Sequence, residues 1–317
     1  MGLTHIRTPK NFVLEDRLER YAAAIEQRPE TYRGRWGEAC APFGGAACGD
    51  MARSGAPCGG AACGDMARVG ATCGNAPCGS ASHGDMPGFG RVHLDLGCGK
   101  GAYLVARAQR EPDALFIGMD TEPICIAYAA QNIVEAGISN AIVLPRGADS
   151  IERLFGPGEL AGITLNFPTP FPKRKFARKR LTSVDHLLSY RRVLAPGAAV
   201  TLRTDSQPLH DYTLTQLDAA GYRVLWASND TRAEHPEHPE TEYERRLAEQ
   251  GAAVYGVCAI PEPEPTPEQI QTGRDAEQSL VAYLPRNLDS IGYIPLGMEG
   301  AVLNLRNRQR NEQAHNH

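Results

Sequence analysis

The chain has 317 residues, of which 42% are hydrophobic, so it can bury one large core or two smaller ones. No run of about 18 apolar residues occurs and the opening residues lack an apolar signal segment, so we expect no membrane span and a cytoplasmic protein. The formal net charge of -4 excludes a uniformly basic protein, and the odd count of nine cysteines indicates free thiols.

Residues 1–39 are predicted to form an N-terminal helical arm. Four apolar residues recur at spacings of three and four, which places them on one face of a helix that ends before Pro29: Leu14, Leu18, Tyr21 and Ile25. Two aromatic residues, Tyr32 and Trp36, follow among basic residues. They could stack on RNA, but we favour the interpretation that they dock the arm on the main domain.

Residues 40–90 form a low-complexity insert, in which the decapeptide GGAACGDMAR occurs at 44–53 and again at 59–68. The unit is rich in glycine and alanine and cannot bury enough apolar surface to offset the entropy lost on folding, so we predict disorder. A metal site is the alternative. The spacing of the candidate ligands is not that of the CxxC pairs of zinc sites, and we predict no metal at Cys58, Cys63, Cys73 and Cys78.

From residue 91 to residue 260 the pattern alternates between apolar strands and helices. The sequence predicts strands at 92–96, 115–119, 141–144, 163–167, 198–202, 222–226 and 254–260. This alternation predicts an α/β fold with a doubly wound, mostly parallel, seven-stranded Rossmann-like sheet and with ligands at the carboxyl ends of the strands. The last two strands are too close in sequence for a helical crossover, so we expect an antiparallel edge strand.

A glycine turn follows the first strand, in the sequence DLGCGKG at 95–101. Gly97, Gly99 and Gly101 permit a tight turn and a close approach of the backbone to a ligand. Asp120 follows the second strand, at the distance where a carboxylate holds ribose hydroxyls. A phosphate-binding loop is disfavoured because neither Ser nor Thr follows the lysine of the turn. We favour a nucleoside cofactor site over a purely structural turn.

The fourth strand leads into a proline-rich loop and then into a strongly basic run. Pro168, Pro170 and Pro172 force the chain out of the sheet, and six of the eight residues at 173–180 are Lys or Arg. A rigid loop followed by a positive cluster suits a polyanionic substrate, although most charge runs are only solvated surface. The acidic balance of the whole chain favours the first interpretation.

Residues 261–317 begin with PEPEPTPEQ, which predicts an extended acidic linker, and continue as a tail of unassigned role. The apolar stretches of the tail, at 280–284 and 291–303, could dock on the main domain. We expect His315 and His317 to be polar tail residues and not metal ligands.

Three features of the core resemble class I S-adenosylmethionine (SAM)-dependent methyltransferases. They are the glycine turn with Asp95, the later Asp120 and the sequence LAPG at 194–197. Within that class, further motifs resemble the tRNA (guanine-N7)-methyltransferases, which have an FPDPW-type loop before a basic cluster, a TD pair and a TxYE motif. The matching segments are FPTPFPKRKFARKR at 167–180, Thr204–Asp205, TEYE at 241–244 and PETYRGRW at 29–36. The resemblance covers residues 10–40 and 91–260.

The resemblance implies transfer of a methyl group from SAM to N7 of a guanine in the variable loop of tRNA. The implied cofactor-binding residues are Asp95, Gly97, Gly99, Gly101, Asp120, Gly147, Asp149, Asn166 and Thr169. The implied substrate-binding residues are Lys173, Asp205, Thr241, Glu242, Tyr243 and Glu244, and the implied catalytic residues are Asp205, Glu244 and Thr169. The implied RNA-binding residues are Lys175, Arg178, Lys179 and Arg180. The implied partner is tRNA, with no membrane and no metal, and the chain is expected to be a monomer or a homodimer.

The sequence departs from the family in the loop after the fourth strand. Thr169 stands where the family has Asp, and Phe171 stands where it has Trp. Loss of a charge near a cationic cofactor suggests an alternative function, a catalytically weakened or inactive tRNA-binding homologue. Plainer roles are also open for two site residues, since Asp205 could cap the following helix and Glu244 could pair with a neighbouring arginine. A small-molecule methyltransferase would leave the basic run unexplained.

Overall fold

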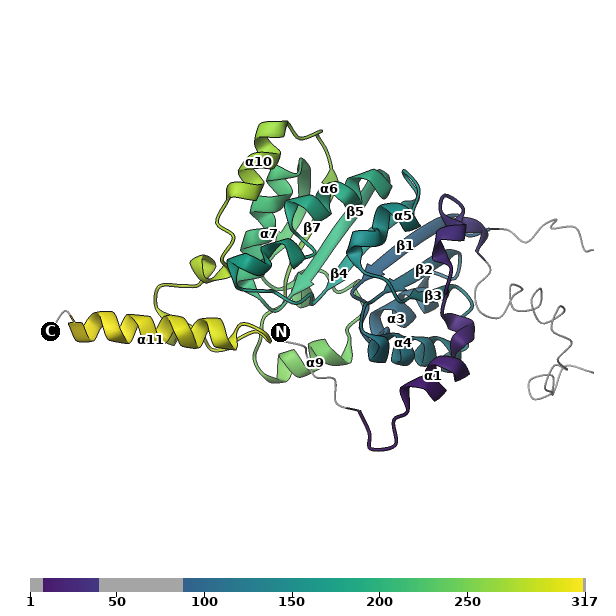
Figure 1. Cartoon of the computed structure of the whole chain (residues 1–317), viewed down its shortest axis with the longest axis horizontal. Coiled ribbons are helices and arrows are strands. Elements are labelled where there is room, and N and C mark those ends of the chain that lie inside the picture. Colours follow the sequence, from purple (N-terminus) through teal and green to yellow (C-terminus); the bar gives the residue numbers. More distant parts are fainter. Residues whose placement is uncertain (1–7, 40–87, 316–317) are drawn as a thin grey trace, which may run out of the picture.

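The computed structural model describes residues 8–39 and 88–315, and its core is a seven-stranded sheet of order β3-β2-β1-β4-β5-β7-β6 (Figure 1). The strands are β1 Arg91–Leu96, β2 Ala114–Met119, β3 Ala141–Leu144, β4 Leu160–Asn166, β5 Leu194–Thr204, β6 Tyr222–Ser228 and β7 Tyr255–Pro261. Strands β1 to β5 are parallel, and β7 is antiparallel to both β5 and β6. The doubly wound sheet and its antiparallel edge are confirmed. The strand order reverses between β1 and β4, where folds of this type bind ligands.

Helices cover both faces of the sheet, which is why the central strands are apolar throughout. On β2, Leu115 and Ile117 pack into the core under the helices α5 Ile151–Leu154, α6 Val184–Val193 and α7 Gln207–Ala219. The alternate residue Phe116 packs into the core under α3 Ala102–Arg110 and α4 Pro123–Glu135. Side chains on a strand point alternately to its two faces, so a strand covered on both faces reads as a continuous apolar run.

The N-terminal arm packs against the edge of the sheet next to β3. Helix α1 Leu14–Arg20 is shorter than predicted, because a 3₁₀ turn η1 Ala22–Ala24 follows and Ile25 pairs with Val143 in a parallel bridge. Two more 3₁₀ turns follow, η2 Pro29–Tyr32 and η3 Trp36–Glu38. Trp36 is fully buried, stacks on Tyr32 and donates from Nε1 to the Leu154 carbonyl at 2.8 Å. The interpretation that the two aromatic residues dock the arm is confirmed.

One strand begins earlier than predicted. The sequence predicts this strand only from residue 198, but α6 stops at Val193 and β5 already begins at Leu194. Leu194 pairs with Leu160, and the register then shifts so that Gly162 pairs with Ala199. Pro196 and Gly197 lie within this shift, where no ladder hydrogen bond is needed from the missing proline N–H.

The segment after β7 is not the extended linker that its prolines predicted. Helix α10 Pro267–Asp275 begins inside it, with Thr266 as the N-cap and Gln269 completing a capping box. Pro267 occupies the first turn, where the absence of an N–H costs nothing. Two 3₁₀ turns, η6 Leu280–Tyr283 and η7 Leu288–Ser290, then lead to α11 Glu299–His315.

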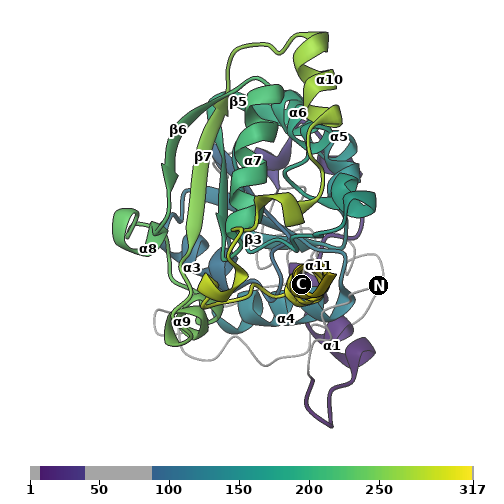
Figure 2. The ribbon, with the colours of Figure 1, turned by 90° about the vertical axis from the view of Figure 1, so that its left-hand side faces the viewer.

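The remaining short helices, α8 Thr231–Glu234 and α9 Glu242–Glu249, lie between β6 and β7 in the chain. Figure 2 looks toward the C-terminal end of α11 and shows the tail passing beside α7. Residues 40–87 of the predicted insert, with its four candidate metal ligands, lie outside the described residues. Within the described ranges, no helix combines the length and the apolar character needed to cross a bilayer.

Candidate functional site

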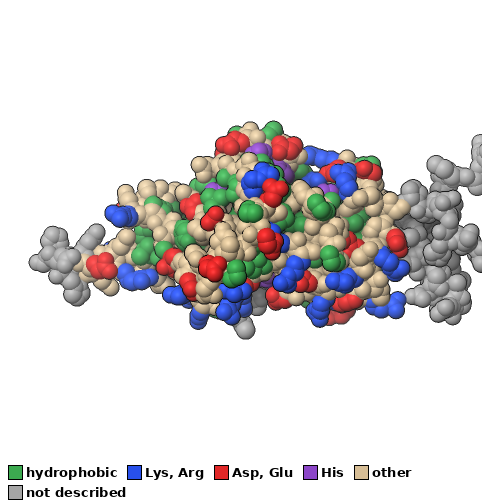
Figure 3. Space-filling view, turned by 90° about the horizontal axis from the view of Figure 1, so that it is seen from above, with side chains coloured by type: hydrophobic (Ala, Val, Ile, Leu, Met, Phe, Trp, Pro, Cys, Tyr) green, Lys and Arg blue, Asp and Glu red, His purple; other side chains and the backbone are tan. Residues whose placement is uncertain are grey.

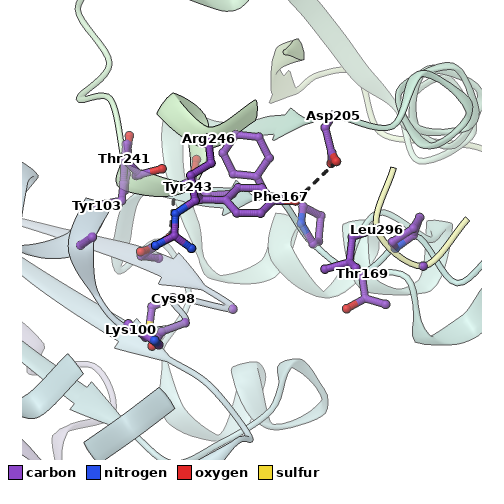
Figure 4. A pocket seen from close by; sticks show the side chains of 18 of the residues that line it. Cys98, Lys100, Tyr103, Phe167, Thr169, Asp205, Thr241, Tyr243, Arg246 and Leu296 are labelled. Atoms are coloured by element: carbon purple, nitrogen blue, oxygen red, sulfur yellow. Dashed lines mark hydrogen bonds between the residues drawn. The ribbon is translucent and has the colours of Figure 1, made fainter. Parts of the chain in front are cut away.

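A cavity of about 740 Å³ opens at the carboxyl ends of β1, β4 and β5. Five segments line it: the glycine turn after β1, the proline-rich loop after β4, Asp205 directly after β5, the start of α9, and the tail where it enters α11. Figure 4 shows Cys98 and Lys100 of the glycine turn at one end and Asp205 at the other. The volume falls within the range of roughly 300–1,000 Å³ that is usual for small-molecule and cofactor sites.

The glycine turn has the backbone shape that only glycine adopts readily. Gly97, Gly99 and Gly101 have φ values of 78°, 54° and 76°, in the left-handed region. A Cβ on Gly101 would lie 2.8 Å from the Cβ of Ala129, so this glycine allows α3 to begin against α4. A Cβ on Gly99 would meet nothing within 4 Å. Gly97 and Gly99 line the cavity, so their missing side chains leave room there for a ligand.

Asp95 forms the floor of the cavity beside the turn. It is almost fully buried, and Nδ2 of Asn166 donates to its Oδ1 at 3.3 Å. Burial raises the pKa of Asp95 to about 7, and the nearby Asp120 carboxylate adds to the rise, while the bond from Asn166 opposes it. The Oδ1 atom of Asn166 is buried and has no hydrogen-bond partner among the described residues. A buried acceptor of this kind needs a donor, which a bound ligand can supply.

Asp120 supports the glycine turn by hydrogen bonding to its backbone and does not itself line the cavity. Its carboxylate accepts from the backbone N–H of Gly99 at 3.0 Å and from that of Glu122 at 2.9 Å. The other predicted acid is displaced further. Asp149 is fully exposed to solvent and lies 3.3 Å from Nε2 of His186, and neither it nor Gly147 reaches the cavity. The positions of Asp149 and Gly147 therefore do not support the prediction that these two residues bind the cofactor.

Asp205 lies at the opposite end of the cavity, directly after β5. It is 9% exposed, and burial raises its pKa. Its Oδ2 accepts from the hydroxyl of Tyr293 at 2.6 Å and faces the hydroxyl of Tyr243 at 3.4 Å. Asp205 does not cap the following helix, since Ser206 is the N-cap of α7 and accepts from the N–H of Leu209. The Asp205 carboxylate is therefore not used for helix capping and is available to a ligand in the cavity.

The TEYE motif begins α9 and contributes two residues to the cavity, Thr241 and Tyr243. Thr241 is the N-cap, and its Oγ1 accepts from the N–H of Glu244. The ring of Tyr243 makes an edge-on contact with Phe167, with centroids 4.9 Å apart, and Figure 4 shows the two rings together (Figure 4). Glu242 is the first residue of the helix.

Glu244 does not line the cavity, which corrects its predicted role as a base-binding and catalytic residue. Its side chain is 0% exposed and forms an ion pair with Arg203 of β5, which is 2% exposed. It also accepts from the N–H of Thr241 at 3.0 Å, which completes a capping box. Both carboxylate oxygens are thus engaged by the protein. The pair fastens α9 to β5 two residues before Asp205.

The proline-rich loop is held in an uncommon backbone conformation. Phe167 and Phe171 have positive φ values of 49° and 45°, a strain of order 1–3 kcal/mol each that persists only because neighbouring structure enforces it. The N–H of Phe167 donates to the carbonyl of Arg203 at 2.7 Å, which fixes the start of the loop. Thr169, at the tip, is exposed and lines the cavity.

Arg180 is not an RNA-binding residue in this structure, which corrects the prediction. It is 0% exposed, and its guanidinium donates to the carbonyls of Pro170 at 3.0 Å, Phe171 at 2.7 Å and Gln278 at 2.8 Å. It also lies over the ring of Tyr212, at 4.4 Å from the centroid. Arg180 therefore fastens the proline-rich loop to the tail and to α7.

The rest of the basic run is exposed. Residues 174–179 form a 3₁₀ turn, η5 Arg174–Lys179, in which the ammonium groups of Lys175 and Lys179 flank the ring of Phe176. Lys173 and Arg178 are exposed as well. Because Arg180 ties this turn to the cavity loop, the exposed cations stay close to the cavity. By contrast, the face seen in Figure 3 has Lys and Arg interspersed with Asp and Glu, so no patch of one sign gathers there (Figure 3).

Several cavity residues were missed by reasoning from the sequence. Leu296, Gly297 and Glu299 of the tail line the cavity, and Tyr293 holds Asp205. They follow a segment that was interpreted as a linker, and the one signal for them was the apolar stretch 291–303. Tyr103 and Arg246 also line the cavity, and they carried no motif of their own.

Comparison with known proteins agrees with this geometry. The family model described as "Putative methyltransferase" matches residues 90–257. A tRNA (guanine-N(7)-)-methyltransferase of Geobacillus kaustophilus is 31% identical over 173 residues, which are 54% of this chain and 80% of that protein. The enzyme of the same name from Streptococcus thermophilus is 32% identical over 169 residues, 53% of this chain and 79% of that protein.

A solved "Structure of an antibiotic related Methyltransferase" superposes with a TM-score of 0.44 and 21% identity, over 54% of this chain and 89% of that chain. The family model covers more than half of the chain, and both relatives are matched over more than two thirds of their length. The chain therefore belongs to the methyltransferase family that includes the tRNA (guanine-N(7)-)-methyltransferases of these bacteria.

Proposed function

We propose that this chain transfers a methyl group from SAM to N7 of a guanine in tRNA, in the variable loop as the resemblance implies. The observation that carries the proposal is one cavity with two different ends. The glycine turn and the buried Asp95 lie at one end, and the carboxylate of Asp205, hydrogen-bonded by Tyr293, lies at the other. A cofactor and a base can therefore meet between them, within reach of an exposed basic turn.

The residues at the glycine end fit SAM, which supplies a methyl group bound to a positively charged sulfur. The open space beside Gly99 accommodates a nucleoside close to the backbone. Asp95 and the unpartnered Oδ1 of Asn166 are acceptors for an ammonium group. Thr169 lies beside Leu296 in the cavity wall and contributes a hydroxyl where the family has a carboxylate, so the cavity carries less negative charge there.

At the other end, Asp205 would orient the guanine. Its carboxylate can accept from the N1–H and the exocyclic amine of the base, which presents N7 on the opposite edge. N7 carries a free lone pair, so the reaction needs alignment and no strong base. An ionised Asp205 also favours the positive charge that develops on the purine during transfer. Tyr243 and Phe167 add aromatic surface beside this position.

The exposed cations of the basic turn would hold the tRNA backbone. Lys173, Lys175, Arg178 and Lys179 face solvent, and none of them is in an ion pair within residues 8–39 and 88–315. Contacts of Lys and Arg with phosphate position an RNA without reading its sequence, and they make affinity fall with salt. Choice of the target base is left to the cavity.

The test is a methyl-transfer assay with labelled SAM and an unmodified tRNA transcript. Reduction and aniline treatment of the product should cleave the tRNA at one guanine in the variable loop. A matched transcript with 7-deazaguanosine at that position lacks the acceptor nitrogen and should take up no label. Binding of tRNA without transfer would contradict the proposal and identify an inactive tRNA-binding homologue. The variant Asp205→Asn should lose most of the activity while it still binds SAM.

A further inference from the structure

The tail returns from α10 to the cavity and is anchored along its path. Leu280 and Met298 are fully buried against Leu209 and Tyr212 of α7. The N–H of Leu280 donates to the carbonyl of Pro172 at 3.0 Å, next to the proline-rich loop. Figure 2 shows this stretch beside α7 (Figure 2). Burial at both ends, together with this backbone hydrogen bond at one of them, makes residues 277–299, called here the tail segment, part of the packed domain.

The tail segment forms a wall of the cavity. Leu296, Gly297 and Glu299 line it, and Figure 4 shows Leu296 beside Thr169 (Figure 4). Gly297 has a φ of 89°, and a Cβ there would lie 3.6 Å from Pro170, so the turn carries the chain past the proline-rich loop. The wall lies outside residues 90–257, which the family model matches. The family motifs therefore do not account for it.

Two groups of the tail segment act on the proposed catalytic Asp205, the backbone N–H of Leu296 and the side chain of Tyr293, and Tyr293 is the one that can be tested by substitution. Its hydroxyl donates to Oδ2 of Asp205 at 2.6 Å. Its ring packs against the buried cluster of Leu247, Ala252 and Val254. With the ring fixed by packing and the hydroxyl fixed by the carboxylate, Tyr293 defines where the oxygens of Asp205 point. The hydroxyl of Tyr243 lies farther from the same oxygen, at 3.4 Å, and therefore makes a weaker hydrogen bond.

We infer that the tail segment completes the guanine pocket and that Tyr293 positions the Asp205 carboxylate for the base, an inference that rests on the proposed function. A carboxylate that must accept two hydrogen bonds from one base edge has to keep one orientation. A short hydrogen bond from a rigid donor removes the alternative rotamers before the substrate arrives. Tyr293 is thus a positioning residue, which acts on the base through Asp205.

The experiment compares Tyr293→Phe with Tyr283→Phe. Each change removes one hydroxyl from the tail and keeps the ring, but the hydroxyl of Tyr283 donates to the carbonyl of Glu277, at 3.3 Å and exposed to solvent. Steady-state methylation of unmodified tRNA is measured at saturating SAM, and the unfolding midpoint of each variant is recorded. We expect Tyr293→Phe to lower kcat about tenfold. KM for tRNA should change less than about twofold, because phosphate contacts dominate the affinity.

Two results would overturn the inference: an unchanged kcat in Tyr293→Phe, or an equal loss in both variants. A wild-type chain that transfers no methyl group would overturn the proposed function instead. The pocket is then tested by the binding of guanosine monophosphate alone. Weaker binding to Tyr293→Phe than to Tyr283→Phe would support the positioning role. Equal binding to both variants, or no binding to the wild type, would refute it.

Discussion

The two ends of the cavity are assembled in different ways. At the glycine end, residues 95–101 form one continuous turn, and the carboxylate of Asp120 supports it from the next strand. At the other end, Asp205 is held by tyrosines that lie 38 and 88 residues further along the chain. The glycine end therefore depends on backbone conformation over a few residues. The Asp205 end depends on packing between distant segments, so different substitutions should damage the two ends.

The largest effect is expected from breaking the buried pair beneath the Asp205 end. Arg203→Met leaves Glu244 as an unpaired buried carboxylate, which should lower the free energy of unfolding by about 3–5 kcal/mol. The measurement is urea-induced unfolding of the variant and the wild type. Because Glu244 also caps α9, the change should loosen the helix that presents Tyr243 to Asp205.

The matched control removes the same charge from an exposed pair. Arg223 pairs with Glu262, and both side chains are more than half exposed, so Arg223→Met should cost less than about 1 kcal/mol. Equal losses in the two variants would show that the buried pair has no special role. The Asp205 end would then not depend on this long-range contact.

The glycine end should respond to a single methyl group, and in two distinguishable ways. Gly101→Ala adds a left-handed alanine and an overlap with Ala129, and should lower the free energy of unfolding by about 2–4 kcal/mol. Gly99→Ala meets no protein atom and should cost only the conformational strain, about 1–2 kcal/mol.

Binding then separates the two glycine variants further. The methyl group of Gly99→Ala projects into the open space beside the glycine turn, where SAM is proposed to bind. This variant should therefore lose more SAM affinity than Gly101→Ala, although it loses less stability. Calorimetric titration of SAM into each variant, at a temperature where both are folded, measures this. Normal SAM affinity in Gly99→Ala would mean that the space beside Gly99 is not where the cofactor binds.

Asp95 gives the glycine end a characteristic pH dependence. Burial raises its pKa in the folded chain to about 7, whereas in the unfolded chain it is near its ordinary value of about 4. Between these values the unfolded chain releases a proton that the folded chain keeps, so the contribution of Asp95 to stability falls as pH rises from 4 to 7. Below pH 4 the contribution is fully present, and above pH 7 the loss is complete.

Asp95→Asn should abolish this contribution. Relative to the wild type, the variant should gain up to roughly 1.4 kcal/mol in the free energy of unfolding for each pH unit between 5 and 7. The control is Asp149→Asn, which makes the same change of residue type at a side chain that is fully exposed. A difference between Asp95→Asn and wild type that does not change with pH would place the carboxyl in a more solvated site.

The glycine end and most of the sheet could be predicted from the sequence because their signals are local. Apolar runs such as 115–119 are fixed by burial on both faces, and the turn at 97–101 is fixed by its glycines. Asp95 was identified as the acidic residue that begins the glycine-turn motif and by the family resemblance. Each of these inferences needs only a few neighbouring residues.

The Asp205 end could be predicted only in part. The residue itself follows a strand and matches a family motif, but Tyr293 reaches it through a tail whose prolines suggested a linker. Composition also does not predict which way a side chain points. Arg180 and Lys179 are adjacent members of one basic run, yet Arg180 is fully buried and Lys179 is exposed. A carboxylate such as Glu244 has equal chemical capacity for a ligand or for a buried arginine. Only the packing decides between them.

The smallest effect concerns the basic turn, where the exposed and buried members of one run can be separated. Lys179→Gln removes one exposed cation and should weaken tRNA binding modestly, lowering the slope of log K against log salt by about 1. The control, Arg192→Gln, makes the same change in net charge at an exposed site on α6. Fluorescence anisotropy with labelled tRNA over a range of salt concentrations gives both slopes. Because net charge changes equally, a lower slope in Lys179→Gln alone would locate the RNA backbone along η5, and equal slopes would remove it from there.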